Sequence, residues 1–383
     1  MKSDLTIRIT AVSLIISVSA MRSAPCLASG DLPDNPKADL SSVQMEKIED
    51  SMERALNWLA LQQKSDGSFR TDDAGEPAVT SLCLLAFLAA GHLPGEGPHG
   101  KMLDRGINFV VGCQRPDGLL ALLPTQPALK PYTPSHTAIY NHAFAGILLS
   151  EVYGMIPEDR SSEIRPAIEQ ALAFTRIRQS EPKRNRLDTG GWRYLRPDVN
   201  SDSDSDLSVT CSQLMFLRSA KGAGFNVHTE WIDEALDYVK RCFEEREGCF
   251  RYELVGNHAE CSRGMVGAGI LSLSLAGMHD TSKVQSAGNW LRRHPFDKYG
   301  ETIGRTDHFH YGAFYCSYAM FQLGEQFWAS FYSQLARTLL ERQLDGGQWP
   351  PDRVDQVFGS TFSTALAVLA LSPPHQMLPI FQR

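Results

Sequence analysis

The chain has 383 residues, of which 43% are hydrophobic and 21% are charged, so it is long and apolar enough to bury a large core. Its formal net charge is −7. An acidic balance without clusters of Lys and Arg argues against nucleic acid and against anionic membrane surfaces as partners. The composition therefore predicts a globular protein.

The first 28 residues have the pattern of a secretory signal peptide. Two basic residues precede an apolar run at 9–18, and small residues at 18–20 and 26–28 offer alternative cleavage points. The run is too short to span a bilayer, and no later segment is long enough for a transmembrane helix. We therefore expect Sec-type export to the periplasm, the cell surface or the medium, with residues 29–44 as a linker.

From residue 45 onward the sequence repeats, and the repetition decides the fold. In each copy an apolar residue and a Gln-like position lie seven residues apart on one helix face, and a Gly-rich turn with an aromatic residue follows. The Gln-like positions are Gln63, Gln114, Gln179, Phe243, His294 and Gln343. Each turn leads into a second helix that is apolar nearly all round, which is typical of a buried helix. These helices are expected at 79–90, 137–153, 207–220, 263–276, 311–323 and 361–371.

Six polar-faced helices that alternate with six apolar helices predict an all-α protein. We expect an α/α toroid of six helical hairpins over residues 45–383, with the apolar helices inside. A helical solenoid of the same pairs is the alternative. Closure into a ring is favoured because it hides the strongly apolar helices from water.

The Gln-x-x-x-Gly-x-Trp-like signature of these turns resembles the squalene-cyclase-type repeat of the terpenoid-cyclase and protein-prenyltransferase superfamily. The resemblance covers residues 45–371. Further stretches resemble an exported bacterial branch of that superfamily, namely 139–145, 151–155, 206–210 and 378–381. The resemblance implies a toroid whose central cavity takes an isoprenoid- or lipid-like ligand, but a fold does not fix a reaction.

An Asp- and Ser-rich run precedes the third apolar helix. In squalene-cyclase-type enzymes an Asp-x-Asp-Asp run stands here, and its middle Asp protonates the alkene. The resemblance carries over to Asp204 and Asp206 as candidate catalytic residues, whereas Leu207 replaces the third carboxylate. Helix capping is the structural alternative. A calcium loop is a second one, with Asp202 in place but with Leu207 where glycine is required.

Histidines and a cysteine near the starts of the later apolar helices are candidate metal ligands. Protein prenyltransferases of this fold bind zinc with Asp, Cys and His at such positions, although the Asp-x-Cys spacing of that family is absent here. The candidate zinc set is His258, Cys261, His308 and His310. Such residues more often cap helices or pack as polar groups, so we expect no cofactor, with zinc or calcium as the alternatives.

Parallel inner helices would bring their six N-termini to one mouth, where free N–H groups and helix dipoles favour anions. We therefore expect a ligand with an apolar body in the cavity and a polar or anionic head at this mouth. The candidate ligand-binding residues are His136, His142, Trp192, Tyr194, His258 and His310. For His136 and His142 a hydrogen bond to a neighbouring helix is the structural alternative, and for Trp192 it is the bracing of adjoining helices.

The cysteines number eight, and removal of Cys26 with the signal peptide would leave an odd number, so at least one thiol stays unpaired. Cys242 and Cys249 are the candidate disulfide partners, because one ends a helix and the other begins the next turn. Free buried cysteines are the alternative.

Three functions remain open on the sequence, and whether the chain is an enzyme is open with them. The first is binding, or transformation, of an isoprenoid- or lipid-like ligand. The second is a non-catalytic scaffold that binds a protein partner. The third is a glycan-active enzyme, which would need two carboxylates across the cavity. A wide aromatic-lined pocket would favour the first, a filled centre the second, and an open groove with a carboxylate pair the third.

Overall fold

The structure is a computed structural model that describes residues 41–199, 201–256, 260–304, 307–353 and 355–382. The expected signal peptide at 1–28, nearly all of the linker and His258 lie outside the described residues. None of the described helices combines the length and apolar character that a membrane span requires.

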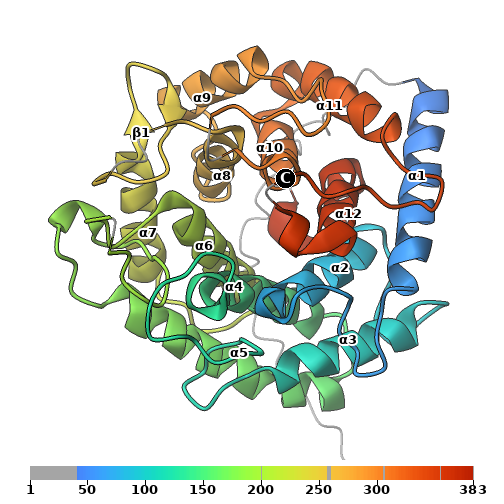
Figure 1. Cartoon of the computed structure of the whole chain (residues 1–383), viewed down its shortest axis with the longest axis horizontal. Coiled ribbons are helices and arrows are strands. Elements are labelled where there is room, and N and C mark those ends of the chain that lie inside the picture. The colour runs from blue at the N-terminus through green and yellow to red at the C-terminus, as the bar shows by residue number, and fades with distance from the viewer. Residues whose placement is uncertain (1–40, 200, 257–259, 305–306, 354, 383) are drawn as a thin grey trace, which may run out of the picture. The chain divides into compact units, whose positions relative to one another are not determined.

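The described part contains twelve α-helices that alternate between an outer and an inner ring (Figure 1). The outer helices are α1 (Ser42–Ala60), α3 (Gly100–Gly112), α5 (Glu158–Gln179), α7 (Thr229–Arg241), α9 (Ser282–Arg293) and α11 (Glu325–Leu340). The inner helices are α2 (Ala78–Ala89), α4 (Pro134–Tyr153), α6 (Leu207–Gly222), α8 (Arg263–Ser274), α10 (Phe309–Leu323) and α12 (Gly359–Leu371).

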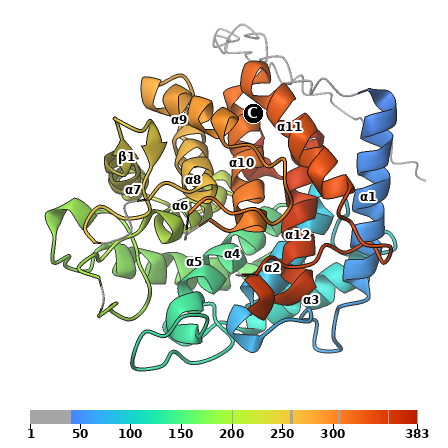
Figure 2. The ribbon, with the colours of Figure 1, turned by 45° about the horizontal axis from the view of Figure 1, so that its top comes forward.

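The inner ring is closed. Each inner helix packs against the next, and α12 packs against α2. Figure 1 shows the consequence, since blue α1 and α2 lie beside orange α11 and red α12, and Figure 2 shows α8 and α10 side by side. The predicted all-α toroid of six hairpins is therefore confirmed, and the solenoid alternative is wrong.

Burial follows the sequence pattern that predicted the two rings. All twelve residues of α2 are buried, as expected for a helix that is apolar all round. The outer α7 instead buries one face, made of Ile232, Ala235, Leu236, Tyr238 and Val239, and leaves its polar face outside. α1 begins three residues before the expected boundary because Ser41 and Gln44 form a capping box.

The repeated Gln clamps each hairpin to the next outer helix. The side-chain Nε2 of Gln179 donates to the carbonyl of Gly190 in its own turn (3.1 Å) and to that of Trp231 on α7 (2.8 Å). The same pair of bonds is made by Gln63 (to Gly67 and Met102), Gln114 (to Gly118 and Ala167) and Gln343 (to Gly347 and Ser51). Because Ser51 lies on α1, the last clamp bonds the end of the ring to its beginning.

Close packing and backbone conformation together require glycine in these turns. Gly190 has φ +89°, and a Cβ there would lie 2.1 Å from the carbonyl oxygen of Glu234 on α7. Glycine alone satisfies both conditions at low cost.

The aromatic residue of the turn is a buried brace. Trp192 is 1% exposed; its Nε1 donates to the carbonyl of Thr175 (2.9 Å), and its backbone N–H donates to Thr210 on α6 (3.1 Å). Trp349 makes the corresponding bond to Thr364 on α12 (3.0 Å). The buried aromatic residues of these turns therefore join outer helices to inner helices through packing and hydrogen bonds.

The C-terminal segment closes the ring at the end where the inner helices finish. The short helix η5 (Pro379–Phe381) packs against α6, and Figure 1 shows this red end of the chain within the ring. The ring of Phe381 stacks on Tyr318 (centroids 3.9 Å apart), and its carbonyl accepts a hydrogen bond from Gln322 (2.9 Å). The Glu151 carboxylate on α4 accepts from the N–H of Ile380 (3.3 Å). The cavity of the toroid therefore has a floor.

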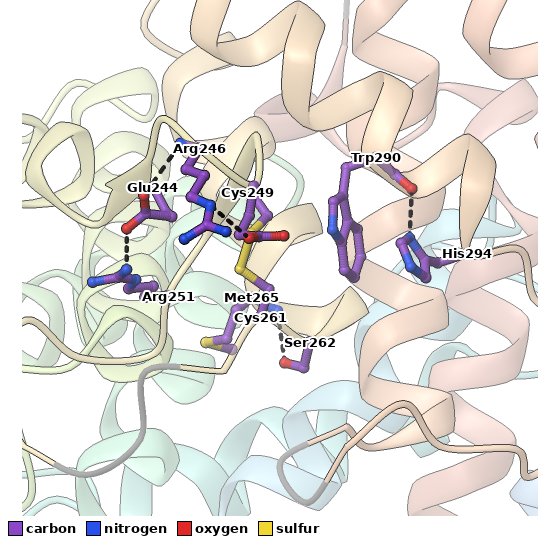
Figure 3. The surroundings of a disulfide bond; sticks show 10 residues. Glu244, Arg246, Cys249, Arg251, Cys261, Ser262, Met265, Trp290 and His294 are labelled. Atoms are coloured by element: carbon purple, nitrogen blue, oxygen red, sulfur yellow. Dashed lines mark hydrogen bonds and ion pairs between the residues drawn. A yellow bond between two sulfur atoms is a disulfide. The ribbon is translucent and has the colours of Figure 1, made fainter.

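The fourth repeat contains a two-stranded antiparallel ribbon, β1 (Phe243–Glu244) and β2 (Cys249–Phe250). Cys249 forms a disulfide with Cys261, so the predicted Cys242–Cys249 bond is wrong (Figure 3). The reason is a backbone pairing of Arg251 with Cys261, which brings the Cα atoms of the two bonded cysteines to 6.2 Å. Cys242 ends α7 as a free, fully buried thiol.

Candidate functional site

A cavity of about 350 Å³ lies where the inner helices begin. Its wall includes one residue from the first turn of each inner helix: Val79, His136, Ser208, Met265, Tyr311 and Phe362. The six helix starts therefore meet around one mouth, as parallel inner helices require. Apolar and aromatic side chains dominate the wall.

The bottom of the cavity is aromatic. Phe144 on α4 lines the cavity and lies 6.5 Å from Phe314 on α10, measured between ring centroids. Phe314 in turn contacts Phe381 of the C-terminal segment (6.1 Å). This stack separates the cavity from the end of the ring where the inner helices finish.

Tyrosine hydroxyls form a hydrogen-bonded arc within the apolar wall. Tyr140 donates to the hydroxyl of Ser208 (3.0 Å), which also bonds the hydroxyl of Tyr311 (2.8 Å). The hydroxyls of Tyr194 and Tyr252 bond each other. The hydroxyl groups therefore satisfy one another, and the aromatic faces remain for an apolar ligand.

Two of the predicted ligand-binding residues line the cavity together. The ring of His136 lies 4.3 Å from that of Tyr194, and both face the cavity. Burial lowers the pKa of His136 to about 4, so the imidazole is neutral at neutral pH. Its Nδ1 has no hydrogen-bond partner among the described residues. His136 can therefore bond to a polar group of a ligand.

Asp206 is a fully buried carboxylate that is not itself part of the cavity wall, but it interacts with Tyr252, which is. It is the N-cap of α6, and its Oδ1 accepts a hydrogen bond from the N–H of Val209 (2.8 Å). Its Oδ2 has no hydrogen-bond partner among the described residues, and the guanidinium of Arg193 is 3.8 Å away. Burial raises the pKa of Asp206 to about 6, while Arg193 and the hydroxyl of Tyr252 oppose the rise. The carboxyl group therefore takes up and releases a proton within one pH unit of neutrality.

Arg193 is the centre of a buried ion-pair cluster behind the mouth. Its guanidinium donates to Glu253 (2.9 Å) and also lies 3.6 Å from Asp198. Arg193 therefore shares its charge among three carboxylates, which leaves Asp206 only partly compensated.

Asp204 faces another way. Its carboxylate accepts the backbone N–H of Arg184 (2.6 Å) and pairs with the Arg184 guanidinium (2.8 Å), near the surface. Burial alone would raise the pKa of Asp204, but the hydrogen bonds and charge of Arg184 outweigh it and lower the pKa. Arg184 also lies 3.8 Å from Asp202. The Asp run therefore neither converges as in a calcium loop nor places Asp204 at the cavity.

His142 and Trp192 lie in the packing between helices, outside the cavity wall. The Nδ1 of His142 accepts the N–H of Leu120 (3.2 Å), and its Nε2 bonds the hydroxyl of Thr175 (2.9 Å). In the second repeat His142 therefore accepts the backbone N–H of the turn residue Leu120, as Thr210 accepts the backbone N–H of Trp192 in the third repeat. Burial lowers the pKa of His142 to about 3, so it is a neutral structural group.

The candidate zinc set is not brought together. Cys261 is bonded to Cys249, so its sulfur is not a thiolate ligand. His308 lines the cavity and bonds Asp355 through Nδ1 (3.0 Å). His310 is fully buried behind the wall.

Two residues of the site were missed in the sequence. Tyr252 stands two residues after the turn aromatic Phe250, as Tyr194 stands after Trp192, and both triplets read aromatic-Arg-Tyr. This repeated triplet is a signal that could have been found. Asp355 lies before the last inner helix, as Asp206 lies before the third, but no sequence pattern pairs it with His308.

A family model described as the prenyltransferase alpha-alpha toroid domain matches residues 38–151 and 147–349. No curated protein matches the chain. Among solved structures, a type II terpene cyclase from Scytonema, in complex with its product merosterolic acid A, is similar with a TM-score of 0.58 and 15% identity, over 88% of this chain and 100% of that chain.

Carbohydrate-active proteins are similar to the same degree. A D-mannose isomerase has a TM-score of 0.61 and 12% identity, over 89% of this chain and all of that one. A GH76 alpha-mannanase from Bacteroides thetaiotaomicron has a TM-score of 0.58 and 12% identity, over 87% and 97% of the two chains. At these identities the likeness shows the fold alone.

Proposed function

Because this chain belongs to the prenyltransferase alpha-alpha toroid family, we propose that its cavity binds an isoprenoid- or lipid-like ligand and that Asp206 protonates it. The observation that carries the proposal is a fully buried carboxyl group with one capped and one unpartnered oxygen, beside an aromatic cavity. The terpene cyclase from Scytonema, which was also solved with geranylgeranyl dihydroxybenzoate as substrate, supports the ligand class.

The cavity favours a small apolar ligand. Its volume of about 350 Å³ is at the lower end of the range of small-molecule sites. Burial of hydrocarbon against Leu82, Phe144 and Phe362 supplies binding energy in proportion to the area removed from water. The Nδ1 of His136, which has no hydrogen-bond partner among the described residues, can bond a polar head at the mouth.

Proton donation to an alkene would proceed without a co-reactant. The O–H bond of protonated Asp206 breaks, a C–H bond forms on one alkene carbon, and the positive charge remains on the other. Tyr252 interacts with Asp206, its hydroxyl bonds that of Tyr194, and both tyrosines line the cavity, so the proton would pass through these two hydroxyls. Aromatic faces in the wall stabilise the cation. Loss of a proton from a neighbouring carbon then returns the proton to Asp206, so the net reaction is an isomerisation or a cyclisation.

The other two functions have less support in the described residues. A glycan-active site needs two carboxylates across the cavity, and among the described wall residues Asp355 is the one carboxylate, paired with His308. A scaffold with a filled centre would have no cavity of this size.

The test separates the two aspartates. We expect native mass spectrometry to detect retention of farnesol or geranylgeraniol by the wild-type protein and by both Asp206→Asn and Asp204→Asn. Turnover of the bound alkene should fall by about 10²–10⁴-fold in Asp206→Asn, as expected for loss of a general acid, and stay unchanged in Asp204→Asn. The wild-type rate should fall as pH rises through about 6, because the acid form of Asp206 is then lost.

Two outcomes contradict the proposal. If the wild-type protein retains neither alcohol, the cavity does not bind this ligand class. If Asp206→Asn, with folding checked by circular dichroism, keeps full turnover, the proton comes from elsewhere.

A further inference from the structure

A second group of buried polar side chains lies between the starts of α10 and α12. His310 is the second residue of α10, and Asp352 and Asp355 lie in the segment before α12. Their exposed fractions are 0%, 6% and 3%. One donor atom of each lies within 4.8 Å of the donor atoms of the other two.

The hydrogen bonds of Tyr299 fix the tautomer of His310. The Tyr299 hydroxyl donates its hydrogen to the carbonyl of Pro350 (2.6 Å), so toward the Nε2 of His310 (2.9 Å) its oxygen must accept. Nε2 therefore carries the N–H, and Nδ1 of the neutral imidazole has a lone pair. This Nδ1 is buried and has no hydrogen-bond partner among the described residues. An acceptor atom is thus held in the interior without a donor.

The two carboxylates are held in place by their neighbours. Asp352 accepts the backbone N–H groups of Phe309 (2.9 Å) and Asp355 (2.8 Å). Oδ1 of Asp355 bonds His308, while its Oδ2 is buried without a hydrogen-bond partner among the described residues. A buried carboxylate oxygen and a buried imidazole lone pair without donors are both costly, and a cation would satisfy both.

We propose that His310, Asp352 and Asp355 bind one divalent metal ion, with Zn²⁺ as the best match. One imidazole nitrogen and two carboxylate oxygens suit zinc, whereas Mg²⁺ and Ca²⁺ prefer sites made of oxygen alone. Three protein ligands leave a coordination position open. Asp355 lines the cavity, so an ion here borders it and can take an oxygen atom of a polar ligand head as its further ligand. Metal binding itself does not depend on the proposed function.

Tyr299 is a positioning residue for the proposed metal site, because its hydroxyl sets the tautomer of His310. It fixes the ring of His310 through the nitrogen that does not bind metal, which is the usual arrangement around a histidine ligand. Tyr299→Phe removes this bond and keeps the ring. We expect it to weaken zinc binding by about 10–100-fold.

The experiment uses the full chain after treatment with EDTA and titrates it with zinc chloride by calorimetry. We expect one equivalent to bind to the wild-type protein, and X-ray absorption to show nitrogen and oxygen ligands at about 2.0–2.2 Å without sulfur. His310→Gln and Asp352→Asn should weaken binding by more than tenfold. His279→Gln is the matched control, because this surface histidine lies 3.3 Å from Asp280 and should leave the titration unchanged. Manganese should bind more weakly than zinc.

The wild-type measurements decide the proposal even if a variant fails to fold. Absence of a one-equivalent site, or sulfur among the ligands, overturns it. So do folded variants that bind zinc like the wild-type protein. A proton on Asp355 shared with His310 would satisfy the same two atoms, and it predicts no zinc binding. Asp206→Asn should bind zinc normally, so failure of the proton donor and failure of the metal site are distinguishable.

Discussion

Asp204 and Asp206 are two residues apart and have opposite environments. The chain bends at Asp204, and Asp206 is extended and paired with Trp192, so one carboxylate meets Arg184 outside and the other is buried. Of the interpretations that the sequence left open, helix capping is confirmed for Asp206, and the proton donation that we propose would use its other oxygen. Oδ1 of Asp206 caps α6, and Oδ2 remains.

Asp206 should make stability depend on pH. Its pKa rises from 3.8 to about 6 on folding, so the folded state binds the proton more tightly. The contribution of Asp206 to the free energy of unfolding is therefore fully present below about pH 4. It is lost as the pH rises to about 6, and the loss is about 3 kcal/mol at most. Asp206→Asn keeps the cap and removes the buried charge. We expect thermal melts to show a higher melting temperature than wild type at pH 8 and little difference at pH 4. Equal differences at both pH values would contradict the raised pKa.

Trp192 should contribute to stability and not to ligand binding. Its replacement by Ala leaves a cavity between α5 and α6 and should cost about 3–5 kcal/mol. Trp192→Phe keeps most of the packing, loses the bond to Thr175 and should cost much less. Denaturant unfolding measures both values. If Trp192→Ala unfolds like wild type while its ligand affinity falls, the predicted ligand contact is right and the brace is wrong.

The role of a residue could be predicted from the sequence only where a local pattern, such as its place at the start of a helix, indicates that role. The cap at Asp206 and the mouth position of His136 follow from their places at helix starts. The environment of Asp206 depends on Arg193, whose side chain also reaches Glu253, 60 residues away in the sequence. The pairing of His308 with Asp355 likewise depends on how α10 packs against α12. Spacing along the chain contains no information about such contacts.

At the scale of the element, the clamp and the glycine turn act as one unit. In the fourth repeat Phe243 stands where four of the other five repeats have Gln, and this repeat carries the Cys249–Cys261 disulfide instead (Figure 3). The bonded loop contains Tyr252 and Glu253, which approach Asp206 and Arg193. The covalent link therefore holds a loop of the site where the hydrogen-bonded clamp is missing.

Gly190→Ala should be strongly destabilising. The new methyl group would meet the carbonyl of Glu234 at 2.1 Å, in a backbone conformation that favours glycine. Gly222→Ala is the control, because it lies in the last turn of α6 with nothing within 4 Å of the added carbon. We expect a loss of several kcal/mol for Gly190→Ala and a change within about 1 kcal/mol for Gly222→Ala in denaturant unfolding. Similar values for the two would show that the turn can move away from α7.

At the scale of the whole molecule, repetition alone predicted the ring and its closure. Six inner and six outer helices were expected, and the observed ends of the inner helices lie within a few residues of the expected ones. The floor could not be predicted, because the segment that forms it follows the last repeat. Its anchor Glu151 precedes Ile380 by 229 residues, and no repeat relates them.

Removal of the Phe381 ring should open this floor. Phe381→Ala deletes a buried side chain between Phe314 and Tyr318, so we expect a loss of about 3–5 kcal/mol and a larger cavity. Binding of longer isoprenoid alcohols should improve relative to farnesol, as measured by native mass spectrometry. Gln382→Ala, next to it but exposed, is the control. An unchanged length preference would mean that Phe144 and Phe314 alone form the floor.

Within the part of the chain that the structure describes, a floor of this kind makes the cavity a blind pocket that opens at the starts of the inner helices. Whatever enters at the starts of the inner helices must leave by the same route, so arrival and departure compete. If the cavity has the proposed function, a second molecule has to wait until the first has gone, and a product that fits as well as its precursor would be a competitive inhibitor. A molecule longer than the pocket must leave its tail outside in the water, so the depth of the pocket acts as a ruler for chain length.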